Sequence, residues 1–486
     1  MAQQNANIQS QPGLSRREKI AYGLGDISNG LAVSSVGFWL LIYLTDVAGL
    51  SAFLAGVAIM IGRAWDAVTD PVMGWITDHT RSRWGKRLPY LLFGAIPYAL
   101  AYFSLWVVPE FASQNAIFVY VTLSLIVFNT CLTVVFVPYT SLTAAITSDY
   151  DERTSLTGFR MFCSQSAFLI GAAVPSFLVL WVVSGGGADF FEKIGLQSFF
   201  GSWGGTARQG YFIMALLFAV IMVCSIWSTF FGCKENNTDD DRIESKSKTP
   251  LHYARAIVTE LKQNPPFRYA VLILLLTNCA ATFIAVNLPY YLQYSVSVRD
   301  HQTKLITILF LMAIIMVPVW VKIARKFGKA ESYRIAMLIY ALVLCTLPFI
   351  RPDTAEYLYV IAVFAGIMHS AALMIPWAIV PDVVEFDELQ TGERREGLFY
   401  GGTTFSYKLA TAIAVFASGT VLSIIGYVPN QPQSAEVVAG LNNLVGPLPA
   451  ILLLCGAILS TKYPLTSAKH KEILAQLEAK RSTSRE

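Results

Sequence analysis

Apolar stretches separated by short polar segments alternate along almost the whole chain. Twelve of these stretches are long enough, as helices, to cross the roughly 30 Å hydrocarbon core of a bilayer. The pattern therefore predicts an all-α membrane protein with twelve transmembrane helices. The predicted spans cover residues 20–45, 52–76, 90–108, 116–146, 155–183, 209–231, 268–294, 303–323, 333–350, 357–380, 398–425 and 444–460.

A polar segment, CKENNTDDDRIESKSKTP (Cys233–Pro250), divides the spans into two sets of six. Both sets contain a Pro-aromatic pair followed by acids and Glu-Arg, and the two prolines, Pro138 and Pro376, stand 238 positions apart. We expect two six-helix halves repeated in parallel, with a cavity between them. The predicted divisions are a cytosolic N-terminal segment (1–19), an N-terminal bundle (20–231), a cytosolic linker with an amphipathic helix (232–267), a C-terminal bundle (268–460) and a cytosolic tail (461–486).

Composition and charge agree with a membrane protein. The chain is 55% hydrophobic and only 14% charged, whereas soluble domains have about 25% charged residues. The net charge of +4 does not indicate a nucleic-acid partner, because the basic residues are sorted by side. With both termini in the cytoplasm, 28 of the 36 Lys and Arg residues lie on the inner side and five on the outer side, as the positive-inside rule requires. We expect contact with membrane lipid and no obligatory protein partner.

The ends of the chain and its cysteines add two expectations. The polar N-terminal segment lacks the features of a cleaved signal peptide, so the first span is expected to be retained. The seven cysteines lie in predicted spans or at their cytosolic margins, which predicts no disulfide framework.

Charged residues interrupt the second span within GRAWDAVTDP (Gly62–Pro71). Asp66 and Asp70 are spaced i and i+4, so they share one helix face, and Arg63 borders that face. An aspartate at mid-bilayer depth costs roughly 2.5 to 3.5 kcal/mol, and two carboxylates a turn apart repel each other. Either one stays protonated or a cation sits between them, so we predict a cation site with Thr69 as a further oxygen ligand. The structural alternative is an Arg63–Asp66 ion pair, which leaves Asp70 unexplained.

Three more charged residues lie inside predicted spans: Asp26 in the first, Arg160 in the fifth and Lys408 in the eleventh. Snorkelling to the interface is the structural alternative for the two basic residues. Both lie several residues from a span end, however, which favours a functional use. Thr404 lies one turn before Lys408 and shares its face. Three rings at similar depth are suited to stacking on a sugar, although lone aromatics in spans commonly only pack: Phe136, Tyr139 and Trp377.

Enzyme chemistry is not indicated. The chain contains no HExxH, GxSxG or GxxxxGK[ST] motif, and no nucleophile stands at a motif-specific distance from a histidine base. His369 in the tenth span is interpreted as a core histidine with a backbone partner rather than as a proton carrier. We therefore predict a non-enzymatic membrane protein without a cofactor.

Several motifs together resemble a known family. KIAYGLGDISNG, YLTDVAGLSAFLAG, GRAWDAVTDPVMGWITDHTRSRWGKRLPYLL, VPYTSLTAAITSDYDERTSLTGFR and IPWAIVPDVVEFDELQTGERREGLFYG are similar to the glycoside–pentoside–hexuronide:cation symporters, the melibiose permease-like family of the major facilitator superfamily. The resemblance covers nearly the whole membrane domain and implies the twelve-helix fold of that superfamily, in a bacterial inner membrane.

The same resemblance implies roles for individual residues. Asp66 and Asp70 would be the cation carboxylates, with Thr69 at the position of a polar ligand. Asp26, Arg160 and Lys408 would line the sugar site. The chain departs from melibiose-type members in the fourth span, where they carry Asp and Trp four residues apart. Here those positions hold Phe136 and Thr140, which together with Thr404 are further candidate substrate residues.

We expect a symporter that alternates between outward-open and inward-open states. Binding of Na⁺ or H⁺ at the acid pair would raise the affinity for a sugar, glycoside or uronide, and the reverse, by linkage. The alternatives are a sodium-dependent lysolipid transporter of the same fold, an uncoupled facilitator and a sensor without flux. Cytosolic ion pairs are expected to hold the outward-open state and to break on opening inward. The residues predicted for gating or structural ion pairs are Arg63, Asp78, Arg81, Glu152, Arg153, Glu393 and Arg394.

Overall fold

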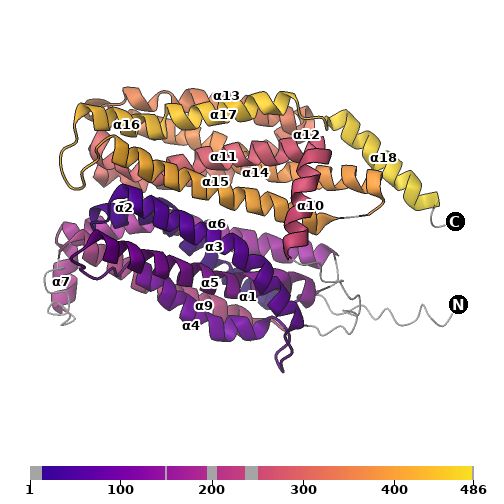
Figure 1. The fold of residues 1–486 in the computed structure, drawn as a ribbon, viewed down its shortest axis with the longest axis horizontal. Coiled ribbons are helices and arrows are strands. Elements are labelled where there is room, and N and C mark those ends of the chain that lie inside the picture. The colour runs from indigo at the N-terminus through magenta and orange to yellow at the C-terminus, as the bar shows by residue number, and fades with distance from the viewer. Residues whose placement is uncertain (1–13, 148–149, 194–204, 236–249, 394, 484–486) are drawn as a thin grey trace.

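The computed structural model of the chain describes residues 14–147, 150–193, 205–235, 250–393 and 395–483 (Figure 1). The regular structure in these ranges is helical, and twelve segments are long and apolar enough to cross a membrane. The predicted all-α membrane fold with twelve transmembrane helices is confirmed.

The first six spans are built from seven helices, because a break at Asp26 divides the first span in two. Serine side chains accept hydrogen bonds at three of the helix starts: Ser15 (with Glu18 in a capping box), Ser51 and Ser113. The helices are α1 (Arg16–Gly25), α2 (Ile27–Asp46), α3 (Ala52–His79), α4 (Leu88–Leu105), α5 (Gln114–Ile146), α6 (Tyr150–Val183) and α9 (Ala207–Gly232), and the short α7 (Gly186–Lys193) follows α6.

The second six spans follow a connecting helix, α10 (Pro250–Gln263), where an amphipathic helix was predicted. Three short 3₁₀ turns stand at η3 (Arg299–His301), η4 (Leu347–Phe349) and η5 (Pro352–Thr354). The remaining elements are α11 (Pro265–Tyr290), the π-helical turn η2 (Tyr291–Ser295), α12 (Gln302–Phe327), α13 (Lys329–Leu344), α14 (Tyr357–Thr391), α15 (Glu396–Ile424), α16 (Ala435–Val445), α17 (Pro447–Thr461) and α18 (Ser467–Thr483).

The two sets of helices form two halves with the same packing order. In the first half α2 packs on α6, α3 on α5, and α4 on α9; in the second half α11 packs on α15, α12 on α14, and α13 on α17. In both halves, therefore, the first span packs on the fifth, the second on the fourth and the third on the sixth. A parallel repeat requires such a common order. In Figure 1 the indigo-to-magenta half and the half that runs from red to yellow lie side by side.

Three helix pairs join the halves: α3 with α15, α6 with α12, and α2 with α11. The first pair approaches backbone to backbone, because a Cβ atom added to Gly419 would lie 2.4 Å from the Ala52 carbonyl oxygen and 3.0 Å from Gly56 Cα. Two glycines facing each other therefore set the separation of α3 and α15. This close pair carries the polar site described below.

The start of α1 and the end of α18 lie at one end of the bundle, and α7 lies at the other (Figure 1). We call these the terminal end and the far end. The C-terminal helix α18 packs on α14 at the terminal end, where its Ile473 and Leu477 side chains are buried. A hydrogen bond of 2.6 Å joins His470 Nε2 to Glu385 Oε2 at the same contact.

Candidate transport site

The two acids of the second span share a basic partner from the opposite half. Asp66 and Asp70 lie one turn apart on α3, and Lys408 reaches them from α15. The Lys408 Nζ atom lies 2.8 Å from Asp66 Oδ2 and also bonds Asp70 Oδ2. The Asp66 side chain is only 4% exposed, whereas that of Asp70 is 33% exposed. The close approach of α3 and α15 thus places one ammonium group between two carboxylates.

Hydroxyl groups complete this cluster. Thr133 Oγ1 on α5 lies 3.1 Å from an oxygen of each carboxylate, and Thr69 Oγ1 lies 3.3 Å from Thr133 Oγ1. Hard cations prefer oxygen ligands such as these. Two carboxylates and one ammonium also leave one uncompensated negative charge in a region of low dielectric. The group therefore has the charge and the ligand type to accept one monovalent cation.

Arg63 does not take part in this cluster. Among the described residues, the basic group paired with Asp66 is Lys408, so the alternative of an Arg63–Asp66 ion pair is not what the structure contains. Arg63 lines a cavity between the halves instead. The helix face was predicted correctly, but the partner of the acids came from a segment more than 300 residues away, which spacing within one helix could not indicate.

Two predicted substrate residues pair within the N-terminal half. Arg160 Nε on α6 lies 3.6 Å from Asp26 Oδ2, and the Asp26 residue is 3% exposed. In the described part of the chain, Asp26 Oδ1 and Arg160 Nε have no hydrogen-bond partner. Tyr139 lies close by: its hydroxyl donates to the Tyr22 carbonyl oxygen at 2.7 Å, and its ring stacks on the Tyr22 ring at 5.0 Å.

The other predicted substrate residues are spread over α5, α14 and α15. Phe136 packs near Tyr139, with ring centroids 6.1 Å apart, and Thr140 Oγ1 donates to the Val137 carbonyl oxygen of its own helix. Trp377 lies 6.3 Å from the Tyr407 ring, and Thr404 is half-buried one turn before Lys408. A sugar-stacking role for these rings stays a prediction.

A cavity of about 150 Å³ lies between the halves. Its wall is mostly aliphatic and aromatic, with side chains from α2, α3 and α6 on one side and from α11 to α15 on the other. The polar groups on this wall are Arg63, Asn278, Thr282, Tyr340, His369, Tyr407 and Thr411. Among the residues predicted for the transport site, Arg63 is the one that lines the cavity in the described part of the chain.

Hydrogen bonds close the far end between the halves. Tyr294 and Tyr427 of the C-terminal half both donate to the Asp46 carboxylate, the latter at 2.7 Å, and Asn430 Nδ2 donates to the Asp46 carbonyl oxygen at 2.7 Å. Burial and the Asp46 carboxylate raise the pKa of the Tyr427 phenol, which keeps it a donor. Pro289 lies near the end of α11, and the π-helical turn that follows carries Tyr294.

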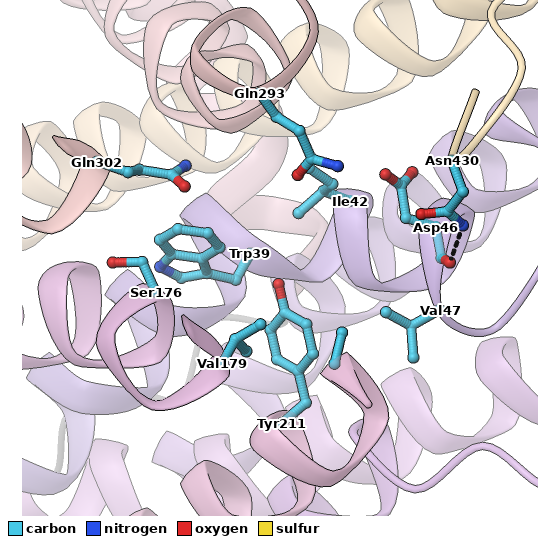
Figure 2. A pocket seen from close by; sticks show the side chains of 11 residues that line it. Trp39, Ile42, Asp46, Val47, Ser176, Val179, Tyr211, Gln293, Gln302 and Asn430 are labelled. Carbon is cyan, nitrogen blue, oxygen red and sulfur yellow. Dashed lines mark hydrogen bonds between the residues drawn. The ribbon is translucent and has the colours of Figure 1, made fainter. Parts of the chain in front are cut away.

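A small cavity of about 60 Å³ lies directly behind this closure (Figure 2). Asp46 and Asn430 border it on one side, and Trp39, Ser176 and Gln302 on the other. Ser176 Oγ lies 2.5 Å from Thr303 Oγ1, a further hydrogen bond between the halves.

At the terminal end, the ion pairs named here among the described residues lie within one half or tie it to the linker. Glu152 pairs with Lys19 at 2.7 Å, both in the N-terminal half, and Arg153 Nε donates to the Thr147 carbonyl oxygen at 2.8 Å. Arg81 is exposed, and the Glu393 backbone N–H donates to the Thr391 hydroxyl. The Asp78 side chain and Arg394 lie outside the described residues. Bridging of the halves by these pairs, expected for an outward-open state, stays a prediction.

Two further ion pairs at this end were not predicted. Arg87, on the loop after α3, pairs with Glu235 at 2.9 Å, just beyond α9. Arg395 binds Asp387 through two nitrogens and also pairs with Glu260 of α10 at 2.9 Å, and the Asp387 carboxylate raises the pKa of the Arg395 guanidinium.

Sequence reasoning also missed Thr133 and Asp46. Thr133 stands one turn before Phe136, and an uncharged hydroxyl in an apolar span gives no charge signal. Asp46 stands in YLTD at the end of the first span, where a charged residue usually marks a helix end. The one local signal is a glycine soon after the helix end, in TDVAGL. This pattern indicates a turn and gives no sign of a contact between the halves.

The comparisons with known proteins agree with this architecture. Residues 21–467 match the family described as MFS/sugar transport protein. An uncharacterised symporter of Synechocystis sp. is 31% identical over 96% of this chain and 97% of its own. The sodium-dependent lysophosphatidylcholine symporter 1-B of Danio rerio is 28% identical over 96% of this chain and 90% of its own. Among solved structures, an inward-facing, occupied bacterial homologue of the human lysosomal transporter Spinster has a TM-score of 0.64 at 13% identity, covering 93% of this chain and 97% of that one.

These matches confirm the predicted resemblance to the symporters of the major facilitator superfamily and the prediction that the protein is not an enzyme. Twelve membrane-spanning helices and a family match over nearly the whole chain make it an integral membrane protein that transports a small molecule. The chain belongs to the MFS/sugar transport protein family of the major facilitator superfamily.

Proposed function

We propose that this protein is a cation-coupled symporter that works by alternating access, with its coupling ion bound at Asp66 and Asp70. The observation that carries the proposal is the buried carboxylate pair bonded to Lys408 of the opposite half. Na⁺ is the preferred ion, because four oxygen-bearing side chains gather there and a relative is named as a sodium-dependent symporter. H⁺ is the alternative.

The geometry suggests how ion binding moves the halves. Lys408 neutralises one of the two carboxylates and holds α15 against α3. A bound cation takes over that neutralisation, so the Lys408 ammonium is displaced and the attraction across the interface weakens. When the ion leaves, Lys408 returns, and the empty carrier avoids two unpaired buried carboxylates during its return step. In this account the coupling ion and Lys408 compete for the same oxygens.

The state of the structure fits one side of this cycle. The bonds to Asp46 join the halves at the far end, whereas three ion pairs of described residues at the terminal end, Glu152–Lys19, Arg87–Glu235 and Arg395–Glu260, stay within one half or bind the linker. With both termini in the cytoplasm of a bacterium, as the distribution of basic residues predicts, this is an inward-facing state in the inner membrane, with Lys408 bonded to both carboxylates.

For the cargo we propose an organic molecule of sugar, glycoside or uronide type, held in the cavity between the halves. The description of the family supports a sugar. The mostly apolar wall favours a second candidate, an amphiphile of the kind named for the sodium-dependent lysophosphatidylcholine symporter. A glycoside with an apolar aglycone would satisfy both observations.

The ion site is tested by direct binding, which needs no knowledge of the cargo. Purified protein in nanodiscs is titrated with radioactive sodium. We expect saturable binding in the native protein, loss of binding in Asp66→Asn and in Asp70→Asn, and native binding in Asp353→Asn, a control at an exposed acid of η5. Native binding in both of the first two variants would contradict the proposed site.

Coupling is tested separately in proteoliposomes, with a cargo found by a thermal-shift screen of glycosides, uronides and lysolipids. Uptake is expected to rise with an inward sodium gradient. A response to a pH gradient alone identifies H⁺ as the coupling ion, and uptake that ignores both gradients leaves an uncoupled facilitator.

A further inference from the structure

Arg63 is placed differently from the other intramembrane charges. Lys408 is bonded to two acids and Arg160 lies beside Asp26. Arg63 has no ion pair or hydrogen bond with the other described residues. It is also the only permanently charged side chain among the described residues that line the central cavity. A guanidinium group on an apolar wall inside a membrane is costly, so its retention indicates a partner that is not part of the chain.

The nearby carboxylates do not supply that partner. Asp66 stands one turn after Arg63 on α3, but its Oδ2 oxygen is bonded to Lys408 and its Oδ1 oxygen lies 3.1 Å from Thr133 Oγ1. Asp70 is bonded to the same lysine and the same threonine. The acids therefore have local partners, and Arg63 faces the cavity.

The wall around Arg63 is suited to an apolar body. Phe38 of α2, Phe168 of α6 and Phe310 of α12 form a cluster of edge-to-face rings with centroids 5.1 to 6.3 Å apart. All three line the cavity, and they come from both halves. Aromatic clusters of this kind bind apolar surface of a ligand efficiently.

Neutral polar groups complete the lining on the C-terminal half. His369 Nδ1 lies 3.4 Å from the Tyr340 hydroxyl, and Asn278 donates through Nδ2 to the Leu274 carbonyl oxygen. These groups supply hydrogen bonds but no opposite charge for Arg63. The cavity thus offers one cationic contact, a few neutral hydrogen-bonding groups and a large apolar surface.

We propose that the cargo is an amphipathic anion, whose carboxylate or phosphate group binds Arg63 and whose apolar body lies against Phe38, Phe168 and Phe310. Arginine suits such groups because its planar guanidinium donates two parallel hydrogen bonds to them. The inference rests on the proposed function only in taking the cavity between the halves as the cargo site.

The same placement gives a physical reason for coupling. Before the coupling ion binds, the cluster of Asp66, Asp70 and Lys408 keeps one negative charge, which opposes the binding of an anion nearby. A bound cation cancels this charge, and an anion at Arg63 then pairs with the guanidinium. Ion and anionic cargo therefore raise each other's affinity.

The test separates charge from apolar body with four matched probes. Binding to protein in nanodiscs is measured for phenyl β-D-glucuronide, phenyl β-D-glucoside, glucuronate and octyl phosphate, with and without sodium. We expect a probe that carries both features to bind at least about tenfold more tightly than the neutral glucoside and the free glucuronate. Whichever of phenyl glucuronide and octyl phosphate binds more tightly indicates whether the anionic group of the cargo is attached to a glycoside or to an alkyl chain.

Variants assign the effect to Arg63. We expect Arg63→Gln to remove the preference for the anionic probe while changing binding of the neutral glucoside less than about threefold, and Arg63→Lys to keep most of the preference. Arg325→Gln, which removes an exposed arginine at the end of α12, is the charge-matched control and should change nothing. An Arg63→Gln variant with the native preference, or with an equal loss for both probes, overturns the inference.

Sodium binding in the same preparation keeps the two proposals apart. Equal or tighter binding of the neutral glucoside in native protein, or no binding of any of the four probes, with sodium bound at Asp66 and Asp70, overturns the cargo class and leaves the coupling proposal standing. If the native protein prefers the anionic probes equally with and without sodium, the cargo class stands and the coupling proposal is overturned.

Discussion

The two ends of the bundle are held together in different ways. At the far end, side chains of one half bond side chains of the other. The Asp46 carboxylate accepts two of these hydrogen bonds, from Tyr294 and Tyr427. At the terminal end, the ion pairs of Glu152 with Lys19 and of Arg395 with Asp387 stay within one half. The far end cannot separate without breaking these bonds, whereas separation at the terminal end leaves these two ion pairs intact.

This difference assigns separate tasks to the polar groups of the two ends. Bonds between the halves control which end is open, and ion pairs within a half stabilise that half in every state. The charge of a residue does not distinguish the two tasks. What distinguishes them is whether its bonding partner lies in the same half or in the other half. Substitutions at the two ends should therefore affect different measurements: labelling of the far end in one case and thermal stability in the other.

The largest effect is expected for Asp46→Ala. The substitution removes both phenol bonds to a carboxylate, each worth about 1.5 to 3 kcal/mol, so the population open at the far end should rise about a hundredfold or more. Labelling of a cysteine placed at Val47, beside the small cavity, measures this opening. Tyr359→Phe is the matched control, because its hydroxyl bonds His301 within the C-terminal half. Unchanged labelling in Asp46→Ala would contradict the role of the far end.

A smaller effect is expected where α3 and α15 touch. Gly419→Ala adds a methyl group 2.4 Å from the Ala52 carbonyl oxygen, so the helices must separate at a cost of about 1 to 3 kcal/mol. The thermal midpoint should fall, and sodium affinity should change because Lys408 reaches the acids from α15. Gly401→Ala on the same helix is the control, since a Cβ there meets nothing within 4 Å. Equal behaviour of the two variants would mean that the close approach has no influence on the site.

At the terminal end, Asp387→Asn should lower stability without opening the far end. Asp387 is 3% exposed and its partner Arg395 is 29% exposed and also bound to Glu260, so we expect a loss of about 1 to 2 kcal/mol. A thermal midpoint lower by a few degrees, with native labelling at Val47→Cys, is the predicted result. Increased labelling would show that pairs within one half also control the gate.

The smallest effect is expected for alkaline pH at the far end. The raised pKa of Tyr427 means that its phenol stays protonated as the pH rises through 10.0, the ordinary value for tyrosine. The hydrogen bond to Asp46 is therefore kept. Thiolate formation by itself speeds labelling as the pH rises, so labelling at Val47→Cys is divided by labelling of the same cysteine in Asp46→Ala, and this ratio should not rise between pH 7 and pH 10. An increase with a midpoint near 10 would show that the phenol titrates normally and that the contact is weaker than described.

Much of this architecture could be predicted from the sequence. Hydrophobic length gives the twelve spans, and the i, i+4 spacing of Asp66 and Asp70 gives their common face, because both are local properties of a helix. The repeat around Pro138 and Pro376 anticipates the common packing order of the halves. The amphipathic pattern behind Cys233 anticipates α10.

The partners of the charged residues could not be predicted in the same way. Lys408 meets Asp66 because Gly56 and Gly419 let two helices from different halves touch, and no pattern within one helix reports such a contact. The role of Thr133 depends on the packing of α5 against α3. Asp46 acquires its proposed function only when the π-helical turn after α11 brings Tyr294 to it.

The central claim, that a coupling ion and Lys408 compete for Asp66 and Asp70, is tested most directly by sodium binding to Lys408→Gln beside the native protein and Lys408→Arg. Removing the competitor should tighten sodium binding about tenfold or more, while the arginine variant stays near or below native affinity. Sodium binding that is unchanged or lost in Lys408→Gln, in protein with a native thermal midpoint, would contradict the account.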